Sequence, residues 1–145
     1  MQKMFTGSHA FIYRLTGGRF GASMRGMKVL LISTRGRKSG RTYTTPIGYF
    51  ERQDGYLVVA SNSGKPVHPA WFLNLKANPQ VTVQVKDRVF QVIAEILPSD
   101  QRAAAWKQVI EAAPVYAGYE SRTSREIPLV LLKPQGQVRG KRKPP

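Results

Sequence analysis

A basic segment at residues 34–41 carries the side chains whose types and spacing best suit the binding of an anion. It holds four cations, two glycines and two hydroxyl side chains between two apolar runs. Glycine permits turns that expose backbone amides, and guanidinium and ammonium groups donate charge-assisted hydrogen bonds to phosphate or carboxylate. The spacing matches neither the P-loop nor the GxGxxG turn of dinucleotide-binding folds. Two interpretations stay open from these residues alone: an anion clamp in another architecture, or a solvated basic hairpin loop.

Positive charge is concentrated in three acid-free segments, residues 1–28, 35–41 and 133–145, which hold 14 of the 23 lysines and arginines of this 145-residue chain. The formal net charge is +15. Such a field attracts polyanions, whether nucleic acid, anionic lipid or a small ligand with several negative charges. Residues 135–145, which are rich in proline, glycine and cations, are expected to form a disordered basic tail.

Little in the sequence supports nucleophilic or metal catalysis. There is no cysteine, the two histidines lack the spacing of a zinc motif, and the eight acidic residues form no obvious pair. No metal site is therefore expected, and any reaction would have to be carried by a cofactor. The lack of cysteine fits the cytoplasmic location that we expect.

Apolar patterning predicts a mainly β protein with helices, of the α+β class. Six strands are expected, at residues 28–34, 43–50, 56–60, 81–85, 89–96 and 127–132. A short helix is expected at 69–77 and a second at 98–113. Because the turn signal at 54–55 and the short connection at 86–88 indicate hairpins, the sheet should be antiparallel and closed. Pro46 marks an edge or a bulge, since proline cannot donate a ladder hydrogen bond.

Residues 1–26 form a basic segment with an amphipathic pattern, in which Phe11, Ile12 and Leu15 have helical spacing. An N-terminal helical segment is therefore expected here. Packing on the domain, shielding of an active site and contact with a membrane surface remain open as its role.

Two groups of residues in the middle of the chain could line a site for a flat ligand. Residues 59–62 are small and end a strand, so that a planar ring could lie on the backbone while Ser61 and Asn62 bond its edge. Trp71 and Asn74 share the short helix and could pack against such a ring and bond to it. The alternatives are an ordinary strand-to-loop junction and a core tryptophan beside a surface asparagine.

Tyr116 and Tyr119 stand three residues apart in a segment with proline and glycine that is expected to be a linker. Each offers apolar area and one hydroxyl group. They could wall a pocket, or they could form a hydrophobic plug under a loop, and the sequence leaves both roles open.

Taken in order along the chain, these features make it similar to the deazaflavin-dependent nitroreductase family, the small split-β-barrel (FMN-binding-like) reductases that use coenzyme F-420. The resemblance covers residues 27–134, which we expect to be the cofactor-binding domain. It rests on the blocks LISTRGRKSG at 31–40, TPI at 45–47, VVASNSG at 58–64, HPAWFLNLKANP at 68–79, YAGY at 116–119 and REIP at 125–128.

The resemblance implies a six-stranded antiparallel split β-barrel with a short inserted helix, a second helix before the last strand and the N-terminal helical segment. It implies an oxidoreductase that transfers a hydride from reduced coenzyme F-420 to a quinone, enone or nitro-type acceptor. The cofactor-binding residues that it implies are Arg37, Lys38 and Ser39 at the phosphate, Tyr43, Thr44, Thr45 and Pro46 beside the deazaflavin, Ala60, Ser61 and Asn62 at the ring, and Ala70, Trp71 and Asn74 closing the pocket. The catalytic residues that it implies are Ser61, Tyr116 and Tyr119, which would face the acceptor.

Two other functions remain as alternatives. One is an FMN- or haem-binding protein of the same barrel class. The other is a nucleic-acid-binding module, for which no RNP or zinc motif is present. A quinone-like small molecule is the expected partner, while homodimerisation and peripheral contact of residues 1–26 with the inner face of the membrane stay open.

Overall fold

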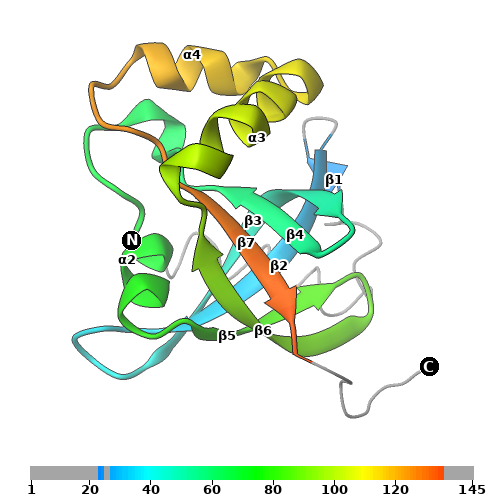
Figure 1. The fold of residues 1–145 in the computed structure, drawn as a ribbon. Coiled ribbons are helices and arrows are strands. Elements are labelled where there is room, and N and C mark those ends of the chain that lie inside the picture. The colour runs from blue at the N-terminus through cyan, green and yellow to red at the C-terminus, as the bar shows by residue number, and fades with distance from the viewer. Residues whose placement is uncertain (1–22, 25–26, 136–145) are drawn as a thin grey trace.

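Hairpin-connected strands close into an antiparallel barrel in the computed structural model, which describes residues 23–24 and 27–135 (Figure 1). The strands are β1 (Ser23–Met24), β2 (Met27–Arg35), β3 (Thr42–Arg52), β4 (Gly55–Val59), β5 (Gln80–Val85), β6 (Arg88–Ile96) and β7 (Leu129–Pro134). They hydrogen-bond in the order β1-β2-β3-β4-β7-β6-β5, and β2 also pairs with β5. This last pairing closes a barrel of six strands, which confirms the predicted fold, and β1 is a short addition to it.

The alternation of side chains along each strand builds two apolar cores, one inside the barrel and one outside it. On β4, Val58 belongs to the inner core, while Leu57 and Val59 belong to the outer one. On β7, Val130 and Leu132 face inward in the same way. Each large apolar side chain that is fully buried stabilises the fold by about 1.5–3 kcal/mol, so both layers contribute to holding the barrel in register.

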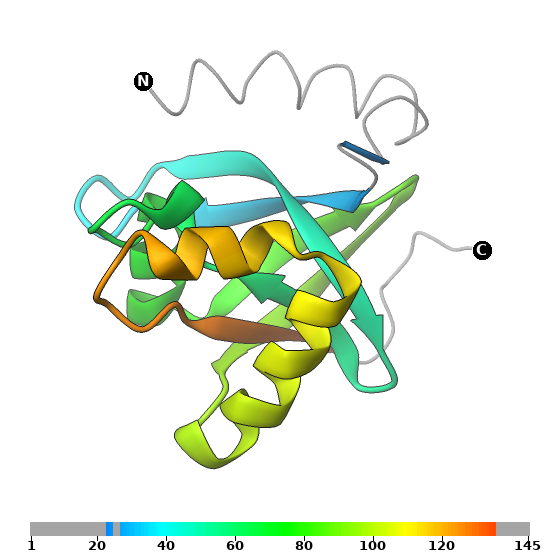
Figure 2. The same ribbon diagram turned by 90° about the horizontal axis from the view of Figure 1, so that it is seen from above.

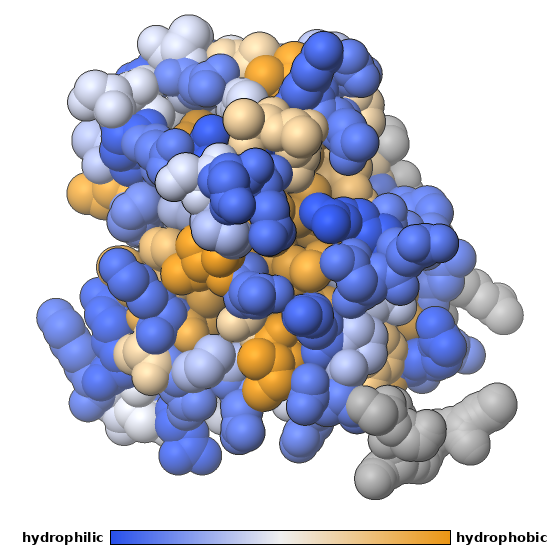
Figure 3. Space-filling view, in the orientation of Figure 1, coloured by the Kyte–Doolittle hydropathy of each residue, from blue (hydrophilic) through white to orange (hydrophobic). Residues whose placement is uncertain are grey.

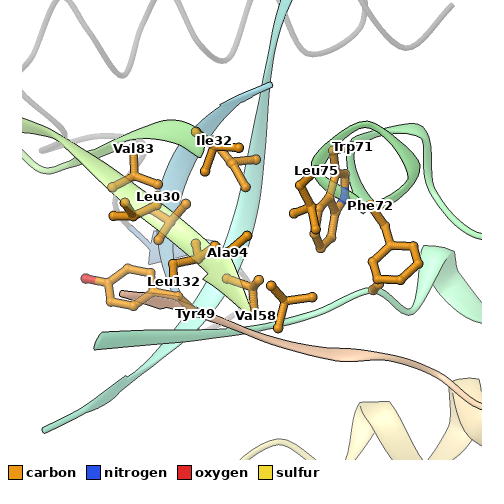
Figure 4. Packing of buried hydrophobic residues seen from close by; sticks show 14 of the residues in the cluster. Leu30, Ile32, Tyr49, Val58, Trp71, Phe72, Leu75, Val83, Ala94 and Leu132 are labelled. Carbon is orange, nitrogen blue, oxygen red and sulfur yellow. The ribbon is translucent and has the colours of Figure 1, made fainter. Parts of the chain in front are cut away.

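Helix α2 (Ala70–Ala77) closes one end of the inner core. Its Trp71, Phe72 and Leu75 are buried, and Figure 4 shows Trp71 and Leu75 pointing from the helix toward the side chains of the strands. The helix begins directly after Pro69, as the sequence predicted. The basic segment at 34–41 lies beside this helix, at the same end of the barrel (Figure 1).

Helices α3 (Ser99–Ala112) and α4 (Val115–Ser121) cover the outer core on one flank of the barrel (Figure 2). The predicted helix at 98–113 is confirmed as α3. The predicted linker around Tyr116 and Tyr119 is wrong, because both tyrosines lie in α4. Pro114 suits the position before a helix, and Gly118 is tolerated in the exposed middle of α4 because packing of the apolar face outweighs its low propensity.

The barrel is split between β3 and β4. Their pairing ends at Tyr49 and Val58. Over residues 42–48, β3 pairs with β2 alone among the strands that the structure describes, and Pro46 lies in this stretch, which confirms its edge position. The chain beyond β4 turns instead into the 3-10 helix η1 (Asn62–Gly64) beside α4. The opening therefore lies between β3 and the end of β4.

The two terminal segments singled out in the sequence lie mostly outside the described residues. Of the predicted helical segment 1–26, only Ser23 and Met24 are described, and they form β1 rather than a helix. Of the predicted tail 135–145, only Gln135 is described. No helix in the described ranges is long and apolar enough to cross a bilayer.

Hydrophilic side chains predominate on the face shown in Figure 3, which has the orientation of Figure 1, and apolar residues appear between them in smaller areas. The large apolar side chains most exposed in the described ranges come from separate places in the chain: Val67, Val89, Ile96 and Val115. Single exposed apolar residues are normal on a folded protein. The charged end of the barrel beside α2 is therefore the more informative surface.

Candidate functional site

A cavity of about 480 Å³ lies between the β2–β3 connection, β3 and α2. This is the size of ordinary small-molecule sites, about 300–1,000 Å³. The cavity brings together eight of the residues predicted to bind the cofactor: Arg37, Lys38, Ser39, Tyr43, Thr45, Ala70, Trp71 and Asn74. Thr34, Gly36 and Arg41 line it as well; the prediction left them out of the site although they belong to the basic segment.

Hydrogen bonds within residues 36–41, which we call the basic loop, fix its shape. Gly36 N donates to Arg41 O at 2.7 Å, and Gly40 N donates to Gly36 O at 2.9 Å. The Ser39 hydroxyl accepts from Arg41 N at 3.1 Å and lies 3.1 Å from the Tyr43 hydroxyl. A Cβ at Gly36 would lie 2.7 Å from the Tyr43 ring and 2.8 Å from Ser39 Oγ. A larger residue at position 36 would therefore require the side chains of Tyr43 and Ser39 to move.

Asn74 ties the basic loop to α2. Its Oδ1 accepts from Arg37 N at 3.1 Å and from Arg37 Nη1 at 3.2 Å, and its Nδ2 donates to Thr34 Oγ1 at 3.2 Å. The side chain is 4% exposed, so the alternative of a surface asparagine is wrong. The amide holds the Arg37 guanidinium at the cavity and does so from a helix that is packed into the inner core.

The cations at the cavity have no carboxylate partner among the described residues. The four ion pairs in those ranges are Lys28–Glu51, Arg52–Asp54, Arg102–Glu126 and Lys133–Glu95. Arg37, Lys38 and Arg41 are in none of them. An uncompensated cluster of guanidinium and ammonium groups at the wall of a cavity favours a ligand with negative charge.

Five of the predicted cofactor residues do not line this cavity: Thr44, Pro46, Ala60, Ser61 and Asn62. The Thr44 hydroxyl lies 2.9 Å from Ser33 Oγ, on the other face of β3. Asn62 Nδ2 donates to Val67 O at 3.0 Å. Residues 60–62 instead flank the split between β3 and β4, and Ala60 shares the inner core with Trp71. Ala60 therefore adjoins the cavity through the core, while Ser61 and Asn62 do not line it.

The family model described as F420H(2)-dependent quinone reductase matches residues 6–134. The chain belongs to the F420H(2)-dependent quinone reductase family. An F420H(2)-dependent quinone reductase of Mycobacterium tuberculosis is 42% identical over 128 residues, which are 86% of each chain. A solved structure of an F420-H2 dependent reductase aligns with a TM-score of 0.65 at 40% identity, over 72% of this chain and 93% of its own. A second solved structure, described only as a domain-swapped dimer, has a TM-score of 0.68 at 34% identity, over 90% of this chain and 97% of its own.

Membership of this family confirms the predicted activity class. The protein is an enzyme, a reductase of the split-barrel type, and its reductant is reduced coenzyme F-420. This outcome favours the F-420 prediction over the FMN, haem and nucleic-acid alternatives.

Tyr116 lies in the outer core of this reductase and not at the cavity. Its ring packs against Phe50 at 6.2 Å and against Tyr119 at 5.8 Å between centroids. Its hydroxyl donates to Met27 Sδ at 3.8 Å. Burial raises the pKa of Tyr116 to about 12, so the hydroxyl keeps its proton at neutral pH. Tyr116 is thus buried in the cofactor-free protein, while Tyr119 is half-buried, and the proposed contact of both tyrosines with the acceptor stays a prediction.

His68 lies between α2 and the segment that precedes β7. Its Nδ1 is 3.0 Å from Arg125 Nη1, and its ring packs against Phe72 at 4.8 Å between centroids. Burial lowers the pKa of His68, and the positive charges of Arg125 and Lys76 lower it further. Because a guanidinium can only donate, Nδ1 must be the acceptor, and the neutral imidazole is the form that fits.

We expect the protein to lose stability as the pH falls below 6.5, the ordinary pKa of histidine, because His68 takes up a proton beside two cations. Its pKa is lower in the folded than in the unfolded protein, so the unfolded state binds more protons. The contribution is complete above pH 6.5 and is lost as the pH falls through the lowered pKa. Urea denaturation at a series of pH values measures this effect.

The variant His68→Asn serves as the reference for this titration. Asparagine offers an acceptor to Arg125 but does not titrate, so its stability should vary less over the same range. The second histidine of the chain is common to both proteins. Identical pH profiles would contradict the assignment of the neutral form to His68.

Proposed function

We propose that the cavity beside α2 receives the anionic part of reduced coenzyme F-420, and that the residues at the split of the barrel hold its ring for reaction with a quinone. The observation that carries this proposal is a set of three cations, Arg37, Lys38 and Arg41, that lack a carboxylate partner within residues 27–135 and stand at one wall of a cavity whose other wall holds Trp71. Coenzyme F-420 has a phosphate and an acidic tail, and such groups suit these donors.

The residues present fit this cofactor. Arg37 is oriented by Asn74, and Lys38 and Arg41 are left with hydrogen-bond donors that no group in the described residues uses. Trp71 contributes an apolar face at the cavity from a helix fixed in the core. When bound, reduced F-420 supplies a hydride; the protein's part is to orient the cofactor and the acceptor and to exclude water.

Ser61, Tyr116 and Tyr119 are the groups we propose for the acceptor side. A hydroxyl that keeps its proton can donate to the oxygen of a quinone as negative charge develops there. Tyr116 meets this condition, because burial raises its pKa to about 12 and because its present acceptor, the thioether of Met27, is weak. Enone and nitro acceptors remain part of the proposal, since they too gain charge on oxygen.

We also propose that the enzyme forms a homodimer, which is supported by the 34%-identical structure described as a domain-swapped dimer. Light scattering of the purified protein tests this. The cytoplasmic location stays a proposal. Contact of residues 1–26 with the inner face of the membrane is a further proposal, which sedimentation with anionic vesicles would test.

The variant Lys38→Glu is expected to weaken F-420 binding by about 2–3 kcal/mol, which is roughly 30- to 150-fold. The substitution removes a charged donor and places a carboxylate beside an anion. Titration of the protein with F-420, followed by fluorescence, measures the dissociation constant. A parallel assay of quinone reduction by the reduced cofactor tests the proposed activity directly.

The matched control is Lys107→Glu, which changes the net charge by the same amount on the exposed face of α3. Its dissociation constant should stay close to that of the wild type, apart from a small long-range effect that added salt removes. Equal weakening in both variants would mean that the protein's total charge acts on the cofactor and that the basic loop is only a solvated hairpin connection.

A further inference from the structure

We propose that Arg125 is a positioning residue of the reductase site, and that it fixes residues 60–68 so that Ser61 and Asn62 face the bound ring in one orientation. The inference rests on the proposed function for that site. Arg125 lies in the segment between α4 and β7 and reaches across to the turn that follows β4.

The Arg125 guanidinium makes four contacts along this turn. Nη2 donates to Ser61 O at 2.8 Å, Nη1 to Ala60 O at 3.3 Å, and Nε to Lys65 O at 3.0 Å. Nη1 also lies 3.0 Å from His68 Nδ1. No carboxylate of the described residues pairs with this cation. All four contacts of the guanidinium in the described residues are therefore to backbone carbonyls of the turn or to His68, which ends it.

The contacts at Ala60 and Ser61 set the direction of the next two amides. Every peptide bond in the described chain is trans, so each carbonyl points opposite to the following N–H. With the carbonyls of Ala60 and Ser61 turned to Arg125, the N–H groups of Ser61 and Asn62 point away from it. Neither N–H has an acceptor among the described residues. Two adjacent donors are thus available to a ligand that carries ring carbonyl groups.

The turn needs such an external constraint because part of its backbone is unfavourable. Asn62 has φ of 49° and Ser63 has φ of 57°, both in the left-handed region that residues with a Cβ rarely adopt. Conformations of this kind persist where surrounding contacts enforce them, and they occur often at binding sites. Arg125 holds carbonyls on both sides of these two residues, at Ser61 directly before them and at Lys65 two positions after Ser63.

A planar guanidinium is required for this role, because three nitrogen atoms must reach acceptors in different directions at once. The ammonium group of lysine presents its donors from a single atom and cannot span Lys65 O and Ser61 O together. We therefore expect Arg125→Lys to fail almost as completely as Arg125→Gln, although it keeps the positive charge.

Arg102 provides a matched control. Its Nε and Nη2 donate to the backbone carbonyl of Ile127 at 3.0 and 2.8 Å, and its guanidinium lies over the Trp106 ring at 4.9 Å. It thus makes the same kind of bond in the outer core, at neither the basic loop nor the turn at 60–68. The variant Arg102→Gln should lose stability for comparable reasons, and it removes no hydrogen bond to residues 60–68.

The test compares Arg125→Gln, Arg125→Lys and Arg102→Gln with the wild type by three measurements. In the cofactor-free protein, hydrogen exchange is measured at the Gly64 and Lys65 amides, which donate to Ser61 O and Asn62 O. F-420 binding and steady-state quinone reduction follow. We expect faster exchange in both Arg125 variants, and a kcat/KM that is lower by about 10- to 100-fold, with most of the loss in kcat because the basic loop still binds the tail.

Three results would contradict the inference or the proposed function on which it rests. Equal exchange and equal kcat/KM in Arg125→Gln and Arg102→Gln would show that Arg125 only adds stability. Full activity in Arg125→Lys would show that the spread of the guanidinium donors is not needed. A wild type that neither binds F-420 nor reduces quinones would overturn the proposed function, while the exchange measurements would still decide whether Arg125 fixes the turn.

Discussion

Replacing Asn74 with alanine is expected to weaken F-420 binding by about 10- to 100-fold and to lower the free energy of unfolding by about 2–4 kcal/mol. The substitution removes three hydrogen bonds, two to Arg37 and one to Thr34. It leaves Arg37 N–H without its buried acceptor and frees the guanidinium to leave the cavity. The affinity falls because the basic loop must then be ordered when the cofactor binds.

Stability and affinity have to be separated in this experiment. The variant Val109→Ala serves for this purpose, because Val109 is 1% exposed in the outer core and its truncation destabilises the protein without contact to the loop. Thermal unfolding gives the stability of each variant, and fluorescence titration at a temperature where both are folded gives the affinity. If Asn74→Ala bound F-420 as tightly as Val109→Ala, the loop would hold its shape without α2.

Most of the barrel could be predicted from the sequence because the signals for hairpins are local. Residues 81–85 and 89–96 are rich in valine and isoleucine and are joined by a short turn, and they form β5 and β6 as expected. The pairing of β2 with β5 that closes the barrel joins segments far apart in the chain. Local patterns do not contain that information, and the expectation of closure depended on the number of hairpins and on the resemblance to a known family.

Helix α4 was missed because its local signals are ambiguous. Pro114 and Gly118 are common in linkers, but proline also suits the start of a helix. Tertiary packing decides the conformation. Tyr116 is 7% exposed and packs into the outer core, and this packing stabilises a helical turn there. A segment of seven residues has too little periodicity to reveal this in advance.

The residue types of the candidate site could be predicted from the sequence, but the hydrogen-bond partners of its side chains could not. Asn74 bonds residues 37 and 40 positions away, and Arg125 bonds groups 57 to 65 positions away. No spacing rule connects such distant residues. The sequence therefore indicated an anion-binding loop and a short helix with tryptophan, while the two side chains that orient the loop and the turn could be recognised only in the folded protein.

The variant Gly55→Ala is expected to destabilise the barrel by about 3–5 kcal/mol, a large part of the 5–15 kcal/mol by which a typical domain is stable. The sequence shows Gly55 only as part of a turn between strands. In the structure its φ is +149°, and a Cβ would overlap the backbone carbonyl oxygen of Leu132 on β7. Because backbone cannot rotate aside as a side chain can, β4 and β7 would have to separate at Tyr56 and Leu132, where they pair.

Gly118→Ala is the control for this prediction, since a Cβ there meets nothing within 4 Å and the residue lies in the middle of α4. It should be neutral or should stabilise the protein by up to about 1 kcal/mol through helix propensity. Thermal or urea unfolding of the two variants measures both effects. Unchanged stability in Gly55→Ala would mean that the hairpin between β3 and β4 shifts without loss, and the close approach of β4 to β7 would then not be what limits that position to glycine.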